Sequence, residues 1–102
     1  FFFTAEPQPT DVQEGQEFRL DCSVQPDNGV HYIWYRLSQE TSDRREVVDF
    51  KKENGRVVER GHSLIVTHAD RRLDDSYYQC RAINGSSNFD IISKPAKVNV
   101  FG

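Results

Sequence analysis

The sequence has little of what metal or redox chemistry would need. It contains two cysteines, Cys22 and Cys80, and no Cys-x-x-Cys pair. The three histidines are scattered, and no spacing of Cys and His matches a metal site; the histidines are His31, His62 and His68. We therefore expect no metal and no other cofactor, and we interpret the histidines as ordinary half-exposed side chains.

Long apolar runs and a basic excess are also missing. No apolar run approaches about 18 residues, so we expect no membrane span. The formal net charge is -3, whereas a nucleic-acid or membrane-surface partner would need clustered positive charge. We expect neither partner and no direct membrane contact. The opening Phe1-Phe2-Phe3 lacks the features of a signal peptide, and we expect both ends to be cut points in a longer chain.

Period-two alternation dominates what remains. A length of 102 residues suffices for one modest core, so we predict a single domain over residues 1–102. Short alternating segments between turn residues favour an all-β sandwich or barrel. Residues 17–24 predict a half-buried strand with its cysteine inward. The inward face of this segment carries Phe18, Leu20, Cys22 and Val24.

Further strands are predicted along the chain. Residues 31–37 and 76–82 alternate clearly, and residues 63–67 and 96–100 do so over shorter stretches. Residues 46–50 and 55–59 are predicted to be short edge strands. Pro7 and Pro9 stand where the first strand would break and cross from one sheet edge to the other, because proline belongs at an edge.

The stretch Asp74-Asp-Ser-Tyr-Tyr-Gln-Cys80 could be interpreted as a reactive thiol with acid and base partners. A reactive thiol needs partial exposure and an electropositive setting. Both cysteines are instead predicted to face an apolar interior, and the carboxylates of Asp74 and Asp75, if they lie close, would raise the thiol pKa. We therefore expect a binding protein and not an enzyme.

The cysteines form a more specific pattern with the lone tryptophan, Trp34, which follows Cys22 by twelve positions. With Gly15, Leu20, Leu64 and the Asp74–Cys80 stretch, they resemble the signature of the immunoglobulin superfamily over nearly the whole chain. The resemblance implies an immunoglobulin-like β-sandwich: two antiparallel sheets with Greek-key topology and an inter-sheet Cys22–Cys80 disulfide packed on Trp34. Such a disulfide would stabilise the fold by about 2–5 kcal/mol and would need an oxidising compartment.

The resemblance also implies roles for single residues. Trp34, Leu20, Leu64 and Tyr78 would lie in the core. Tyr78, two positions before the second cysteine, matches the tyrosine corner, whose hydroxyl bonds to upstream backbone. Asp74 matches an aspartate that pairs with an arginine, and here the partner would be Arg56 or Arg60.

The short region between the predicted strands at 31–37 and 63–67 resembles the intermediate (I-set) type of adhesion and guidance receptors. Residues 1–23 and 91–102 are similar to the first immunoglobulin domain of the netrin-receptor group, deleted in colorectal carcinoma and neogenin. Residues 70–80 are also similar to receptor-like pseudokinases. The resemblance implies an extracellular module of a cell-surface, single-pass membrane protein in adhesion, axon guidance or signalling, and it transfers no functional residue.

One predicted sheet face has the composition of a protein interface, because it is apolar and aromatic with an arginine. It carries Ile33, Tyr35, Leu37, Tyr77, Gln79 and Arg81. The partner would be another protein, either a homophilic or heterophilic ectodomain or a secreted ligand. Alternatively, the segment that follows residue 37 covers part of this face, or neighbouring side chains cover each other. The domain would then be a spacer that positions its neighbours.

Asn84-Gly85-Ser86 is an N-glycosylation sequon at a predicted hairpin tip, and we expect a glycan on Asn84.

Overall fold

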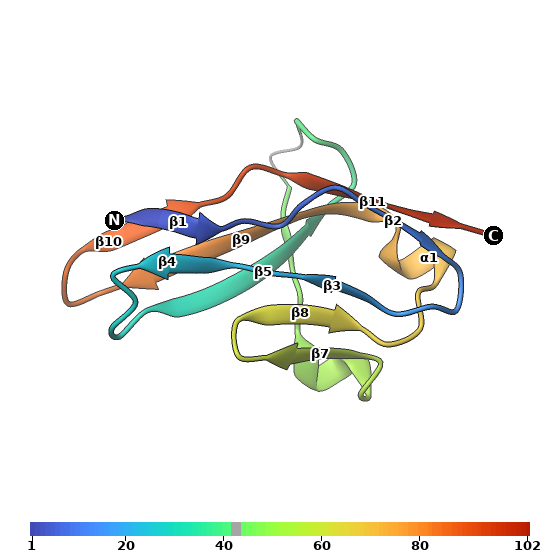
Figure 1. Cartoon of the computed structure of the whole chain (residues 1–102), viewed down its shortest axis with the longest axis horizontal. Helices are drawn as coiled ribbons and strands as arrows, with labels where there is room; N and C mark the ends of the chain where they lie inside the picture. Colours follow the sequence, from blue (N-terminus) through green and yellow to red (C-terminus); the bar gives the residue numbers. More distant parts are fainter. Residues whose placement is uncertain (42–43) are drawn as a thin grey trace.

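Two β-layers pack face to face in the computed structural model, which describes residues 1–41 and 44–102 (Figure 1). The larger layer has the strand order β2-β11-β9-β5-β6, with β10 beside β9. Its strands are β2 (Thr10–Gln13), β5 (His31–Leu37), β6 (Glu46–Val47), β9 (Ser76–Asn84), β10 (Phe89–Ile92) and β11 (Ala96–Phe101). Strands β2 and β11 run parallel, and the other neighbours in this sheet are antiparallel.

The smaller layer combines a β3-β8-β7 sheet with a β1-β4 pair. Its strands are β1 (Phe2–Ala5), β3 (Phe18–Leu20), β4 (Ser23–Gln25), β7 (Val57–Arg60) and β8 (Ser63–Val66). Two single helical turns complete the described fold, the 3-10 turn η1 (Phe50–Glu53) and α1 (Arg71–Asp74). The predicted edge strand at 46–50 is shorter than expected, because the Asp49 carboxylate accepts from the Lys51 backbone N–H and caps η1.

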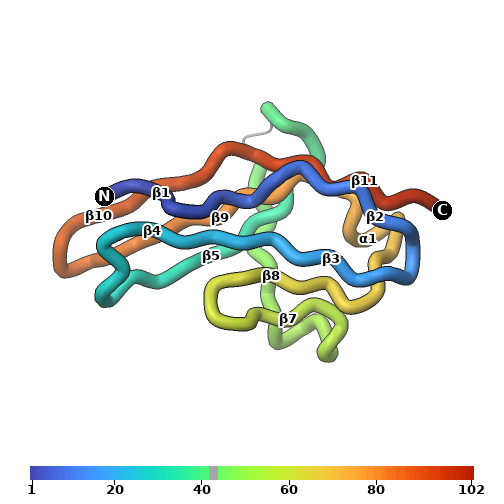
Figure 2. Tube along the Cα trace, viewed as in Figure 1, coloured from blue at the N-terminus to red at the C-terminus, as the bar shows by residue number. Residues whose placement is uncertain are grey.

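The first strand changes layers at its prolines, as predicted. Strand β1 pairs with β4 of the smaller layer, whereas β2 pairs with β11 of the larger one. Pro7 and Pro9 lie between β1 and β2, where a missing backbone N–H interrupts no ladder. Figure 2 shows this crossing of the N-terminal segment.

The core lies between the layers and is closed by the Cys22–Cys80 disulfide. The inward positions of the strands fill it, and its largest fully buried side chains include Trp34, Tyr78, Leu20 and Leu64. Trp34 keeps its indole N–H satisfied by donating to the His62 carbonyl at 3.0 Å. The predicted all-β, immunoglobulin-like sandwich with an inter-sheet disulfide is therefore confirmed.

The described residues occupy 44 × 28 × 22 Å, and the two chain ends lie at opposite ends of the long axis (Figure 1). Among these residues, no helix has the length and apolar character needed to cross a membrane.

Candidate interaction surface and the network behind it

Alternation in β5 and β9 gathers the predicted interface residues on the outer face of the larger sheet. The strands are antiparallel neighbours, and the residues form three cross-strand pairs: Ile33 with Arg81, Tyr35 with Gln79, and Leu37 with Tyr77. Paired residues share a face of the sheet. The sequence therefore predicted which side chains come together.

The exposure expected for this face is wrong for three of the six residues. Leu37 is 2% exposed, Gln79 5% and Tyr35 8%. Two contacts account for part of the cover: Arg45 donates to the Gln79 amide oxygen at 3.0 Å, and Arg81 donates to the Tyr35 hydroxyl at 3.3 Å. The alternative is therefore partly correct, since three of the six residues are buried and two of them are contacted by Arg81 or by the segment after β5.

Two apolar side chains that sequence reasoning missed are open on the same face. Val47 in β6 pairs with Tyr35 and is 56% exposed, and Ile92 in β10 pairs with Arg81 and is 39% exposed. Their position depends on the register of β6 and β10, which composition does not reveal. The signal was the doublets Val47-Val48 and Ile91-Ile92, because consecutive apolar residues in a strand put one on each face.

An open hollow of about 380 Å³ lies on this face. Its lining residues are Tyr35, Arg45, Arg81, Asp90 and Ile92. We refer to Tyr35, Arg45, Val47, Arg81 and Ile92 as the outer-sheet surface. In this surface, Arg81 donates two hydrogen bonds to the Asp90 carboxylate, at 2.7 and 2.5 Å. These bonds hold the pKa of the Asp90 carboxyl below its usual range, although an exposed pair of this kind adds little stability.

A chain of hydrogen bonds through the buried residues Gln79 and Ser93 holds Arg45, which lines the hollow. The Gln79 amide nitrogen donates to the Ser93 carbonyl at 2.9 Å, while its oxygen accepts from Arg45. The Ser93 hydroxyl in turn accepts from the backbone N–H of Cys80 at 3.0 Å. The Gln79 amide is therefore fixed through both its nitrogen and its oxygen, and Gln79 lies in β9 next to the disulfide residue Cys80.

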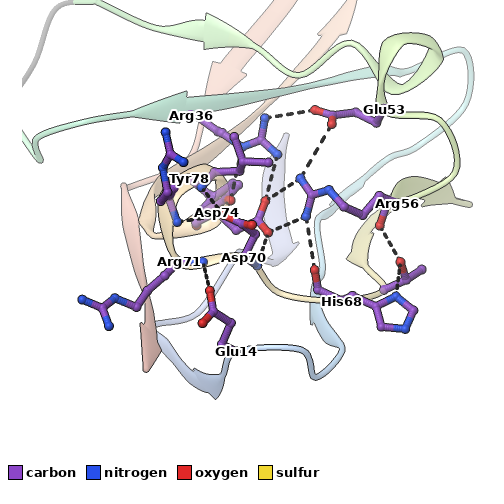
Figure 3. Close-up of polar contacts among 12 residues, drawn as sticks. Glu14, Arg36, Glu53, Arg56, His68, Asp70, Arg71, Asp74 and Tyr78 are labelled. Atoms are coloured by element: carbon purple, nitrogen blue, oxygen red, sulfur yellow. Dashed lines mark hydrogen bonds and ion pairs between the residues drawn. The ribbon is translucent and has the colours of Figure 1, made fainter. Parts of the chain in front are cut away.

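The predicted ion pair of Asp74 is formed with Arg56 and not with Arg60 (Figure 3). Asp74 is fully buried and accepts from two guanidinium nitrogens of Arg56 at 2.6 and 3.0 Å. It also accepts from the Asp70 backbone N–H at 2.7 Å. Arg60 is the last residue of β7 and is exposed, so Arg56 is the arginine that brings its guanidinium to the buried carboxylate.

Arg36 and Glu53 join this network, and sequence reasoning missed both. The Arg36 guanidinium lies 3.2 Å from a Glu53 carboxylate oxygen and 3.5 Å from Asp74, and Figure 3 shows it beside Arg56. The signal was the position of Arg36, two residues after the inward Trp34. An arginine at an inward strand position requires a buried carboxylate partner.

Tyr78 completes the network as the predicted corner. Its hydroxyl donates to the Asp74 backbone carbonyl at 2.8 Å and accepts from the Arg36 guanidinium at 3.2 Å. Burial raises the pKa of the Tyr78 hydroxyl to about 12, so this group stays neutral at physiological pH. These contacts brace the fold and leave Tyr78 no opening to a substrate.

The side chain of the sequon asparagine is held within the fold, and the glycan on Asn84 stays a prediction. Asn84 is 8% exposed and its amide nitrogen donates to the Asn28 carbonyl at 2.7 Å. Its oxygen accepts from the backbone N–H and hydroxyl of Ser86. Alternation in β9 would have indicated this, because Tyr78, Cys80 and Asn84 all fall on the inward face.

No group of three or more His, Cys, Asp or Glu side chains is placed to hold a metal ion within residues 1–41 and 44–102.

Comparison with known families decides the kind of domain that carries these features. A model of the immunoglobulin domain family matches residues 2–84. The chain belongs to the immunoglobulin domain family. Its fold is one that is typically non-catalytic.

Solved structures with the same fold include further immunoglobulin (Ig) domains. "Tandem Ig repeats of Dlar" matches with a TM-score of 0.79 and 18% identity, covering 97% of this chain and 46% of that one. The complex of titin M10 with obscurin-like 1 Ig matches with a TM-score of 0.71 and 24% identity, covering 98% of this chain and 92% of that one. The N-terminal four Ig domains of Dscam1 isoform 8.4 match with a TM-score of 0.75 and 22% identity, covering 91% of this chain and 22% of that one. This immunoglobulin domain thus spans less than half of the Dlar and Dscam1 chains, and the likeness concerns the fold.

Proposed function

We propose that this domain is a protein-binding module of a cell-surface receptor ectodomain and that its outer-sheet surface contacts another protein. The observation that carries the proposal is the pair of open apolar side chains, Val47 and Ile92, beside the Tyr35 hydroxyl and the Arg81 guanidinium. Aromatic, arginine and apolar side chains together are typical of interface centres.

The wider setting supports an extracellular role. The Cys22–Cys80 disulfide needs an oxidising compartment, since cytosolic thiols are kept reduced. The similarity of both ends to the netrin-receptor group favours a receptor in adhesion or guidance. The similar structures of Dlar and Dscam1 contain repeated Ig domains, and the similar titin structure is a complex with an obscurin-like 1 Ig domain. A binding role for the present domain agrees with these settings.

A binding screen tests the proposal. The oxidised chain is presented to itself and to a panel of secreted ectodomains, and each interaction is measured again with Ile92→Asp and Val47→Asp. The matched control is Leu73→Asp, since Leu73 is 58% exposed, at least as open as Val47 and Ile92, but lies in α1, outside the outer-sheet surface. We expect the two surface variants to weaken binding about tenfold or more and the control to leave it unchanged.

The screen also separates the alternatives. Self-association would indicate homophilic adhesion, and binding to another ectodomain would indicate ligand reception. If no ectodomain binds, or if Leu73→Asp weakens binding while both surface variants do not, the outer-sheet surface is not the interface. The domain would then act as a spacer, or it would bind through its loops.

A further inference from the structure

Arg45 is held in a different way from the paired arginines of this domain. Four arginine side chains of the described chain lie against carboxylates: Arg19 against Asp21, Arg36 and Arg56 against Asp74 and Glu53, and Arg81 against Asp90. Arg45 instead donates its Nε–H to the neutral amide oxygen of Gln79 at 3.0 Å. Within residues 1–41 and 44–102, no carboxylate forms an ion pair with it. Its positive charge is therefore oriented without being neutralised by any carboxylate of the described chain.

The anchor under Arg45 is built into the fold. Gln79 is almost fully buried, and its amide nitrogen is committed to the Ser93 carbonyl, so the amide oxygen must face Arg45. Ser93 is itself buried and accepts from the Cys80 backbone N–H. A guanidinium that is already fixed through Nε has less side-chain freedom to lose when a partner binds. Its two terminal nitrogens are the ones left for that partner.

Two carboxylates near Arg45 in the described chain do not pair with it. Asp90 lines the same hollow, but both of its oxygens accept from Arg81. Glu46 follows Arg45 directly, yet it pairs across the sheet with Arg36, whose side chain faces inward, so Glu46 points away from the outer face. Of the two arginines that line the hollow beside Tyr35 and Ile92, Arg81 is therefore paired with Asp90, and Arg45 is the one without a carboxylate partner in the described chain.

We propose that the outer-sheet surface binds a protein segment that presents an aspartate or glutamate carboxylate to the terminal nitrogens of Arg45, with an adjacent apolar side chain packed on Ile92. The proposal rests on the proposed function and specifies the chemistry of the partner. A guanidinium and a carboxylate match in a planar, two-bonded geometry, which gives both affinity and orientation. A sulfated glycan would need several unpaired cations close together, whereas of the two arginines in this surface Arg81 is already paired with Asp90.

Panning a displayed library of random dodecapeptides on the oxidised domain tests this chemistry. We expect the enriched peptides to carry Asp or Glu next to an apolar residue. Arg45→Gln should weaken their binding about 10- to 100-fold, which is the range for a hydrogen bond to a charged group. Replacing the peptide acid with its amide should cause the same loss and no further loss in the Arg45→Gln domain.

Arg60→Gln is the matched control, because Arg60 is an exposed arginine of β7 in the other layer, without a described ion pair. It should leave binding unchanged. If the enriched peptides lack acids, or bind Arg45→Gln as well as the parent but fail on Ile92→Asp, the carboxylate proposal is wrong while the proposed function stands. If peptide binding is unchanged by both Arg45→Gln and Ile92→Asp, the carboxylate proposal and the proposed function are both wrong. Heparin binding that depends on Arg45, without acidic peptides, would replace the proposed partner with a sulfated polyanion.

Discussion

Asp74→Asn is a sharp test of the buried network, because it removes a charge and keeps the shape. The buried carboxylate accepts from Arg56, from Arg36 and from the Asp70 backbone N–H. Asparagine would turn amide hydrogens toward two guanidinium groups that only donate. The substitution therefore leaves cations without their shared anion.

The magnitude follows from the burial of the two arginines. Breaking a buried ion pair by removing one partner costs about 3–5 kcal/mol. The side chains of Arg56 and Arg36 are 25% and 13% exposed, and both retain contact with Glu53. Water and Glu53 thus relieve part of the cost, and we expect a loss near the low end, about 3 kcal/mol. This is a large part of the roughly 5–15 kcal/mol total of a small domain.

Equilibrium urea unfolding at pH 7 measures this loss. Trp34 is the one tryptophan of the chain and is buried in the core, so its fluorescence reports the transition. Arg56→Gln should cost about 2–3 kcal/mol, whereas Arg60→Gln should change stability by less than about 0.5 kcal/mol. The double variant Asp74→Asn/Arg56→Gln should lose less than the sum of the single losses. A loss below about 1 kcal/mol for Asp74→Asn, or equal effects of the two arginine variants, would refute the reasoning.

Two further predictions concern single polar groups. Because burial raises the Tyr78 pKa to about 12 from about 10 in the unfolded chain, its stabilising effect is complete below pH ~10 and lost as the pH rises to ~12. Tyr78→Phe should remove this alkaline loss, which is measured by comparing the urea stability of the variant and the parent at pH ~8 and ~11. At pH 7 the same substitution should cost about 1–3 kcal/mol, because the Asp74 carbonyl loses its hydrogen-bond donor. Asn84→Ala should cost about 1–3 kcal/mol in the same assay, because the Asn28 carbonyl and Ser86 lose their partner. The intact mass of the domain secreted from eukaryotic cells tests the predicted glycan on Asn84, and a glycan there would mean that this side chain leaves its buried position.

The fold was predictable because it depends on local alternation. Period-two patterns indicated the main strands, and the positions of Cys22, Trp34 and Cys80 resembled an immunoglobulin sandwich. The surface was less predictable, because it depends on which short strands lie beside β5 and β9. The cover that Arg45 places over Gln79 arises from the segment after β5 and from the direction of one amide. No propensity or period in the sequence specifies either.

The parallel pairing of β2 with β11 has a mechanical consequence. The two strands run in the same direction over four residue pairs, from Thr10 with Val98 to Gln13 with Phe101. With the chain ends at opposite poles of the long axis (Figure 1), tension between the ends pulls β2 and β11 past each other along their length. Their hydrogen bonds are then loaded together in shear, and none can be peeled open before the rest. A pull on both ends of the domain would therefore be shared by all four β2–β11 pairs.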